Sequence, residues 1–535
     1  MSRPSLLRST MSFTGGTFVS RILGLVREMV FASVFGANAA TDAFWVAFRI
    51  PNFMRRLFAE GSFSTAFVPA LTEMKESGSR EDLRLMVARV AGTLGAILLV
   101  ITALGVLFAP EVTSLFAPGS RDEPAKFQLT SDLLQITFPF LLFISLTALS
   151  GAVLNTFHRF AIPAVTPVIM NLCMIAAALW WAPYFDVPVT SMAWAILIAG
   201  GLQLAVQLPV LARLGLLSWP RWGWRAPEVR KVMRLMVPTL FGSSVAQVNL
   251  LFDTLIASLL ITGSQSWLAQ SDRLLEFPLG MFGVALGTVI LPSLSRHHVN
   301  TDHVGFSRAL DWGLRTTLLI AIPAMLGLVL LAEPLVATLF QYGKYKPHDT
   351  QMAAMSLAAL SFGLPAFALV KVLAPAFFAR QDTRTPVRAG VTSMLANMVL
   401  NALFLGLLFA LWHKPEDLAH GWLDGLSRVP GLHMALALAS ALASYLNLAM
   451  LWRALRRDAV YAREPGWGRF SVRLLLACTV MVAVLVAGRL LCADWTQVGW
   501  VTRAWQLALL VGGGGLSYVG VLFAMGFRVS HLRGV

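Results

Sequence analysis

The chain has 535 residues, of which 57% are hydrophobic and only 13% charged, and its mean hydropathy is +0.70. A soluble protein carries about 25% charged residues, so a soluble core of this size is excluded and a multi-span membrane protein is indicated. The net charge of +15 does not indicate nucleic-acid binding, because most Lys and Arg lie between apolar runs, where membrane topology accounts for them.

Apolar runs long enough to cross a membrane recur along the whole chain. Each is close to the ~20 residues that a helix needs to cross the hydrocarbon. The sequence therefore predicts an all-α polytopic membrane protein with about fourteen transmembrane helices. We place them at 11–36, 40–71, 84–109, 127–155, 160–182, 188–213, 232–262, 272–298, 310–335, 352–379, 386–411, 430–453, 470–492 and 503–526.

Lys and Arg concentrate in alternate loops. Residues 75–84, 213–231 and 453–469 contain three, five and five Lys or Arg, whereas residues 182–188 and 263–270 contain none. The positive-inside rule then predicts that both termini are cytoplasmic, which requires an even number of spans. No convincing small-residue cleavage site follows the first apolar run, so we predict no removable signal peptide.

The first two predicted spans carry charged residues within apolar sequence: Arg21, Arg27, Glu28, Asp42, Arg49, Arg55, Arg56 and Glu60. Each costs roughly 3 kcal/mol or more to insert, so the set must be paired, hydrated or used on a charged substrate. At 100° per residue, the side chains of Asp42, Arg49, Arg56 and Glu60 fall on one helix face.

We interpret this set as the lining of a hydrated, anion-binding cavity. The planar guanidinium of Arg makes bidentate contacts with a diphosphate and keeps its charge when desolvated. Glu28, Asp42 and Glu60 would balance the positive charge of the empty cavity. Two alternatives stay open: some of these pairs are structural, or Arg55 and Arg56 extend to a water interface.

A second polar cluster lies at the head of the eighth predicted span and contains Ser266, Asp272, Arg273 and Glu276. Arg273 and Glu276 have i,i+3 spacing, so they are neighbours on a helix. The cluster is either an interfacial cap with a local ion pair or a second part of the cavity. Asp253, within the seventh span, is a candidate site for a coupling cation or proton, and a structural role fits its position about as well.

The sequence also contains a short internal repeat, and it lacks enzyme motifs. Pro51 and Pro69 in the second span correspond to Pro278 and Pro292 in the eighth, which indicates duplicated halves. No nucleotide-binding or hydrolase motif is present, so we expect no cofactor, and uphill transport would draw on an Na⁺ or H⁺ gradient or the membrane potential.

The cysteines and histidines give no sign of a metal site. Cys173, Cys478 and Cys492 are isolated, so we predict neither a disulfide framework nor a metal–thiolate site. The nine His residues show no metal-ligand spacing.

Several motifs of a known kind occur along the chain, in segments 20–28, 35–37, 41–44, 51–61, 271–278, 283–288, 341–344 and 380–386. They resemble the motifs of the MurJ/MviN family of lipid II flippases, within the multidrug/oligosaccharidyl-lipid/polysaccharide exporter superfamily. The resemblance is most specific in the N-terminal part and weak in the last four spans. One departure is Glu28, where we expect Asp in related sequences.

The resemblance implies a bacterial inner-membrane transporter that serves peptidoglycan synthesis. It would move lipid II (undecaprenyl-diphosphate disaccharide-pentapeptide) to the periplasmic leaflet by alternating access, among membrane lipids as neighbours. It implies an N-lobe with its cytoplasmic linker (1–220), a C-lobe (221–457) and two further helices that form a groove for the lipid tail (458–535).

The resemblance also implies roles for single residues. Some family members bind sodium between spans seven and eleven; Asp253 could match the first carboxylate, and span eleven has no clear match for the second. The implied substrate-binding residues are Arg21, Arg27, Arg55, Arg273 and Ser266, and the acidic positions of the family map onto Asp42, Asp272 and Glu276.

Two other functions remain open at the level of sequence. One is export of another polyprenyl-linked glycan or of drugs by the same kind of fold, although a drug exporter should have an acidic cavity. The other is a non-transporting scaffold for cell-wall synthesis and division enzymes. A scaffold would tolerate neutralisation of the arginines together with their acidic partners.

Overall fold

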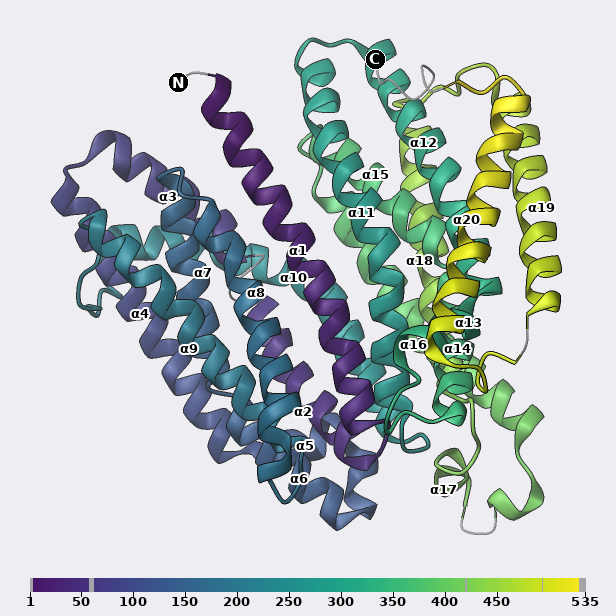
Figure 1. The fold of residues 1–535 in the computed structure, drawn as a ribbon. Helices are drawn as coiled ribbons and strands as arrows, with labels where there is room; N and C mark the ends of the chain where they lie inside the picture. The colour runs from purple at the N-terminus through teal and green to yellow at the C-terminus, as the bar shows by residue number, and fades with distance from the viewer. Residues whose placement is uncertain (1–2, 57–61, 419–420, 493, 529–535) are drawn as a thin grey trace. The chain divides into compact units, whose positions relative to one another are not determined.

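A computed structural model describes residues 3–56, 62–418, 421–492 and 494–528 (Figure 1). These residues are mostly helical, and no strand occurs among them. The chain divides into two compact units, Met1–Ser266 and Trp267–Val535. The predicted all-α class is therefore confirmed, whereas the predicted domains 1–220, 221–457 and 458–535 stay a prediction.

The first unit contains α1 to α10 and the start of α11. The helices are α1 (Arg3–Phe35), α2 (Ala39–Arg55), α3 (Ser62–Ser77), α4 (Arg80–Leu107), α5 (Ala109–Phe116), α6 (Pro124–Thr137), α7 (Phe140–Thr156), α8 (Ala161–Ala176), α9 (Thr190–Arg213), α10 (Pro227–Ser258) and α11 (Ser264–Val299). Short turns follow α5 (η2, Pro118–Asp122) and α8 (η3, Ala177–Trp181, and η4, Ala182–Tyr184). In this unit α1 packs along α8, α2 along α6 and α10 along α3.

The second unit contains the rest of α11 and the helices α12 to α20. They are α12 (His303–Leu330), α13 (Ala332–Phe340), α14 (Pro347–Ser361), α15 (Leu364–Phe378), α16 (Arg384–Trp412), α17 (Trp422–Leu426), α18 (Met434–Arg457), α19 (Trp467–Leu491) and α20 (Trp500–Ala524), with a short turn η5 (Pro415–Leu418). Here α18 packs against α14, α15 and α16, and α19 pairs with α20 (Figure 1).

Ten of the predicted spans correspond to helical segments that are long and apolar enough to cross a membrane. Nine segments within the described residues meet this test outright, and the pair α14–α15, bent by 41°, makes a tenth. The other four predicted spans correspond to α1, the α2–α3 pair, α10 and α11. These four contain the charged residues that the sequence singled out, and with them the helices fit the predicted total of about fourteen.

The C-terminal pair α19–α20 is held to the rest of the second unit by apolar and polar contacts. Leu474 of α19 shares a buried cluster with Leu319 of α12. Tyr518 of α20 donates a hydrogen bond of 2.6 Å to the Leu319 carbonyl. Arg503 donates to the carbonyls of Ala337 and Gln341 at 3.0 and 3.2 Å, which satisfies the C-terminal end of α13.

Candidate functional site

The corner between α1 and α2 fixes the first charged residue of α2. Gly36 follows α1 with φ +73°, a conformation that glycine adopts without strain. Asn38 then caps α2, because its side chain accepts from the backbone N–H groups of Ala40 and Thr41 at 3.0 and 3.2 Å. The capped first turn holds Asp42 at a defined place.

Asp42 caps the start of α11 from a different helix. One carboxylate oxygen accepts from the Gly263 backbone N–H at 2.7 Å. The other accepts from the backbone N–H and the hydroxyl of Ser266 at 3.1 and 2.9 Å. Asp42 is 3% exposed and Ser266 is fully buried. The orphan N–H groups at a helix start and the positive end of its dipole both favour a carboxylate, so these contacts offset part of the cost of burying Asp42.

Arg49 reaches the same connection two turns further along α2. Its Nη1 donates to the Thr254 hydroxyl at 3.0 Å and to the Gln265 side-chain carbonyl at 2.7 Å. Gln265 in turn donates to the Thr254 carbonyl at 2.7 Å, and the Ser266 hydroxyl lies 3.1 Å from that of Thr41. We call this network the α2–α11 latch; it comprises Thr41, Asp42, Arg49, Thr254, Gly263, Gln265 and Ser266.

Arg27 and Glu28 form a buried ion pair on α1. Arg27 is 8% exposed and Glu28 is 4% exposed. The Nη1 atom of Arg27 donates to the Asn171 side chain of α8 at 3.2 Å. Asn171 also donates to the Ser20 carbonyl at 3.1 Å, so it ties α8 to α1 at this level. The pair is thus supported by a polar side chain that was not among the predicted site residues.

The remaining basic candidates of α1 and α2 are more exposed. Arg21, Arg55 and Arg56 are each partly buried. Arg55 donates to the Asn52 side chain at 2.9 Å, and Arg56 donates to the Gln247 side chain of α10 at 3.4 Å. Glu60, predicted to share the helix face of Arg56, lies outside the described residues.

The second polar cluster is divided between the two units. Ser266 belongs to the latch, whereas Asp272, Arg273 and Glu276 lie further along α11. Arg273 pairs with Glu276 at 3.2 Å, and their side chains are 29% and 58% exposed. The predicted i,i+3 ion pair is therefore present, and it is far more exposed than the pair on α1.

Asp253 lies on α10, where the Asn249 side chain donates to its carboxylate at 3.2 Å. No group of three or more His, Cys, Asp or Glu is placed to hold a metal ion in the part of the chain that the structure describes. The coupling-ion role of Asp253 stays a prediction.

The second unit anchors α11 through residues that were not predicted from the sequence. The Trp267 indole donates to the Asp349 carboxylate at 3.1 Å, and the Ser271 hydroxyl lies 2.8 Å from that of Ser356. All four side chains are buried. Ser356, like Thr254 in the latch, is a polar residue inside an apolar run, which marks it as a group that needs a partner. Asp349 lies in polar sequence ahead of that run and gives no such signal.

Comparisons with known proteins cover nearly the whole chain. The family model described as "Lipid II flippase MurJ" matches residues 31–414. A Vibrio cholerae protein named "Probable lipid II flippase MurJ" is 45% identical over 537 residues, covering 99% of this chain and 98% of that protein. A Burkholderia cenocepacia protein named "Lipid II flippase MurJ" is 39% identical over 543 residues, covering 99% of each.

Solved structures agree with these relatives. A structure described as "Lipid II flippase MurJ, inward closed conformation" matches with a TM-score of 0.77 at 27% identity, covering 95% of this chain and 97% of that one. An inward-facing multidrug transporter of the MATE family matches with a TM-score of 0.62 at 11% identity, covering 82% of this chain and 95% of that one, and shows a shared fold only. The chain is a multi-span protein of the bacterial inner membrane, a transporter and not an enzyme, and it belongs to the MurJ family of lipid II flippases.

Proposed function

We propose that this chain moves lipid II from the cytoplasmic to the periplasmic leaflet of the inner membrane by alternating access. The observation that carries the proposal is 45% identity, over 99% of the chain, to a protein named as a probable lipid II flippase. The retained intramembrane charges support it, because each is costly in a bilayer and such residues mark substrate pathways.

In this proposal Arg21, Arg27, Arg55 and Arg273 bind the diphosphate and sugar-peptide head group. A guanidinium can exchange a protein acceptor for a phosphate oxygen without changing its own charge. Glu28 and Glu276 hold Arg27 and Arg273 when no substrate is bound, which is supported by the two ion pairs. Asp272, Arg56 and Glu60 contribute to the charge balance around the bound head group.

The α2–α11 latch is the gate in the same proposal. Its bonds are directional and buried, so they favour one arrangement of α2 and the α10–α11 connection over others. When Asp42 leaves the start of α11, the backbone donors of Gly263 and Ser266 must find water or a substrate oxygen. Ser266 would bind substrate only after this release, because Asp42 now accepts its hydroxyl hydrogen bond.

The proposal also covers the orientation of the chain in the membrane, the driving force for transport and the protein partners. Both termini lie in the cytoplasm, and the driving force is the membrane potential or an Na⁺ or H⁺ gradient sensed at Asp253. Cell-wall synthesis and division enzymes are the protein partners we would expect beside such a transporter.

Depletion of the protein in cells tests the proposal. The fraction of lipid II in each leaflet is followed with a reagent that does not cross the inner membrane. We expect lipid II to accumulate in the cytoplasmic leaflet, and wild-type protein supplied in trans to restore the periplasmic fraction. An unchanged distribution after depletion, in cells with no second flippase, would contradict the proposal and favour export of another glycan or a scaffold role.

A further inference from the structure

The connection between α9 and α10 exposes aromatic and basic side chains in alternation. Trp219, Trp222 and Trp224 are 89%, 66% and 48% exposed. The rings of Trp222 and Trp224 stack with centroids 6.2 Å apart, and Arg221 and Arg225 beside them are exposed. We call residues 217–225 the Trp–Arg segment. Exposed Trp side chains interleaved with Arg are typical of a membrane–water interface.

The segment is fixed to the side of α4 by its backbone. The Arg221 N–H donates to the Ala88 carbonyl at 2.9 Å, and the Gly223 N–H donates to the Thr93 hydroxyl at 3.0 Å. Just beyond the segment, Glu228 pairs with Arg89 of α4 at 2.7 Å. The backbone of the segment is therefore fixed against α4, and its exposed side chains have defined positions.

Two glycines make this close approach feasible. A Cβ atom added at Gly92 of α4 would lie 2.3 Å from the Arg221 carbonyl oxygen, and one added at Gly223 would lie 2.7 Å from the Cβ of Arg89. Both distances are shorter than van der Waals contact allows, so a larger residue at either position would push the segment away from α4. The close contact between α4 and the Trp–Arg segment therefore depends on a glycine on each side, Gly92 in α4 and Gly223 in the segment.

The attachment point also sets the depth of the segment in the membrane. The charged residues of α4 end at Arg89, and residues 90–107 contain none. The segment is bonded to Ala88 and Thr93, which flank the point where the charged turns give way to the apolar run. In a membrane-spanning helix, such a boundary is expected at the level of the lipid head groups, where Trp rings lie in the interface and guanidinium groups meet phosphates.

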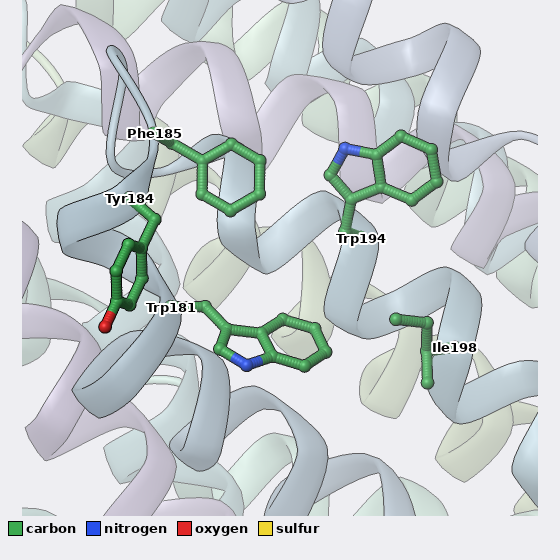
Figure 2. Close-up of a pocket in the computed structure, with 5 residues that line it drawn as sticks. All are labelled: Trp181, Tyr184, Phe185, Trp194 and Ile198. Carbon is green, nitrogen blue, oxygen red and sulfur yellow. The ribbon is translucent and has the colours of Figure 1, made fainter.

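A second exposed aromatic surface in the same unit provides a contrast. Figure 2 shows Trp181, Tyr184, Phe185, Trp194 and Ile198 around a hollow of about 490 Å³. None of these five side chains is charged. Trp194 lies near the start of α9 and the Trp–Arg segment follows its end, so the two surfaces lie at opposite ends of that helix. The hollow suits apolar chains of any lipid, whereas the Trp–Arg segment also carries charge.

We propose that the Trp–Arg segment is a binding surface for anionic phospholipid head groups, of the phosphatidylglycerol class. Arg221 and Arg225 bind the phosphate, and the Trp rings lie against the glycerol and upper acyl region. Glu228, the acidic residue nearest to Arg225 in the sequence, is paired with Arg89 and leaves the charge of the segment positive. The surface does not depend on which substrate the protein transports.

Fluorescence quenching by brominated lipids tests this proposal on the full chain in vesicles. The vesicles contain phosphatidylcholine with a fixed minor fraction of phosphatidylglycerol, and the bromines are carried by one lipid or the other at equal mole fraction. The wild-type signal minus that of a Trp219→Phe/Trp222→Phe/Trp224→Phe variant isolates the segment. The wild-type signal minus that of a Trp181→Phe/Trp194→Phe variant isolates the uncharged hollow as a matched control.

We expect the segment signal to be quenched severalfold more strongly by brominated phosphatidylglycerol than by brominated phosphatidylcholine, and the hollow signal to be quenched equally by both. An Arg221→Gln/Arg225→Gln variant should lose this preference. Gly92→Ala should weaken it, whereas Gly95→Ala should not, because a Cβ at Gly95 meets only Leu146 at 3.9 Å. Equal quenching of the segment by the two lipids would overturn the proposal, and so would the absence of quenching by either, which would place the segment in water or against a protein partner.

Discussion

The charged side chains before and after Pro51 of α2 differ in burial and in hydrogen-bond partners. Before Pro51, Asp42 and Arg49 are 3% and 7% exposed, and both side chains bond to the 254–266 connection at 2.7–3.1 Å. After Pro51, Arg55 and Arg56 are partly exposed, and they bond to amide side chains at 2.9 and 3.4 Å. The helix and its C-cap, Arg56, therefore combine buried charges that fasten them to their neighbours with charges that are partly exposed.

Within residues 42–56, this difference separates a structural or gating charge from a ligand-binding one, whereas Arg27 of α1 is both buried and assigned to binding. A buried charge that holds several hydrogen bonds is destabilising to remove, since its partners are left unsatisfied. A partly exposed arginine contributes little to the free energy of unfolding, so its removal should mainly weaken substrate binding. Variants can therefore be ranked by the ratio of lost stability to lost transport.

The largest loss of stability is expected for Arg27→Ala. It leaves Glu28 as a buried carboxylate without its cation, which costs about 3–5 kcal/mol of unfolding free energy. We expect a large fall in the thermal unfolding midpoint of the purified protein and loss of complementation in depleted cells. The matched variant Arg27→Gln/Glu28→Gln should recover most of the stability and none of the complementation. Full complementation by this double variant would remove Arg27 from the binding set.

The next largest loss of stability is expected for Asp42→Ala. The variant leaves the backbone donors of Gly263 and Ser266 buried without an acceptor, at a cost of about 3 kcal/mol. Asp42→Asn keeps one acceptor oxygen, so its unfolding midpoint should lie between those of wild type and Asp42→Ala. Amide hydrogen exchange at residues 263–266 should accelerate in the same order. Wild-type exchange in Asp42→Ala would show that Asp42 does not hold the latch.

A smaller loss of stability is expected for Arg49→Lys. The lysine side chain is shorter, so its ammonium nitrogen does not reach the position from which Nη1 of Arg49 donates to both Thr254 and Gln265, and loss of one such bond costs about 1–2 kcal/mol. The charge is kept, so a change in the thermal midpoint reports geometry and not electrostatic attraction. A midpoint equal to that of wild type would mean that charge alone fastens this part of α2.

The smallest loss of stability and the clearest loss of transport are expected for Arg55→Gln and Arg273→Gln. Each removes a partly exposed charge, so the unfolding free energy should change by less than about 1 kcal/mol. Complementation should nevertheless fail, because the diphosphate loses a bidentate partner. Arg428→Gln, which removes the arginine of an exposed ion pair with Asp424 outside the predicted site, serves as the control and should complement. A stable, fully complementing Arg55→Gln variant would break the distinction between the halves of α2.

The helices could be predicted from the sequence because hydropathy acts locally. Ten predicted spans correspond to segments that hydropathy alone identifies, and the charged spans correspond to α1, α2–α3, α10 and α11. Helical periodicity also placed Asp42 and Arg49 on one face, and both reach the same connection. The i,i+3 pair of Arg273 and Glu276 was likewise a local inference.

The partners of these charges could not be predicted in the same way. Asp42 meets Ser266 across 224 positions and Arg27 meets Asn171 across 144, and neither distance in the sequence follows from periodicity. Asp42 and Ser266 were predicted separately and with different roles, whereas the structure joins them in one network. Close backbone contacts, such as that of Gly92 with Arg221, depend on the absence of a side chain and leave no hydrophobic pattern.

Translocation by the purified protein in vesicles tests the central claim most directly. Lipid II with a fluorescent label on its peptide is placed in one leaflet, and its appearance in the other is followed with a quencher that does not cross the bilayer. We expect wild-type protein to accelerate the transfer, and folded Arg55→Gln, Arg273→Gln and Arg27→Gln/Glu28→Gln proteins to leave it slow. Transfer by these variants at the wild-type rate would contradict the claim, because the arginines would then have no part in moving the head group.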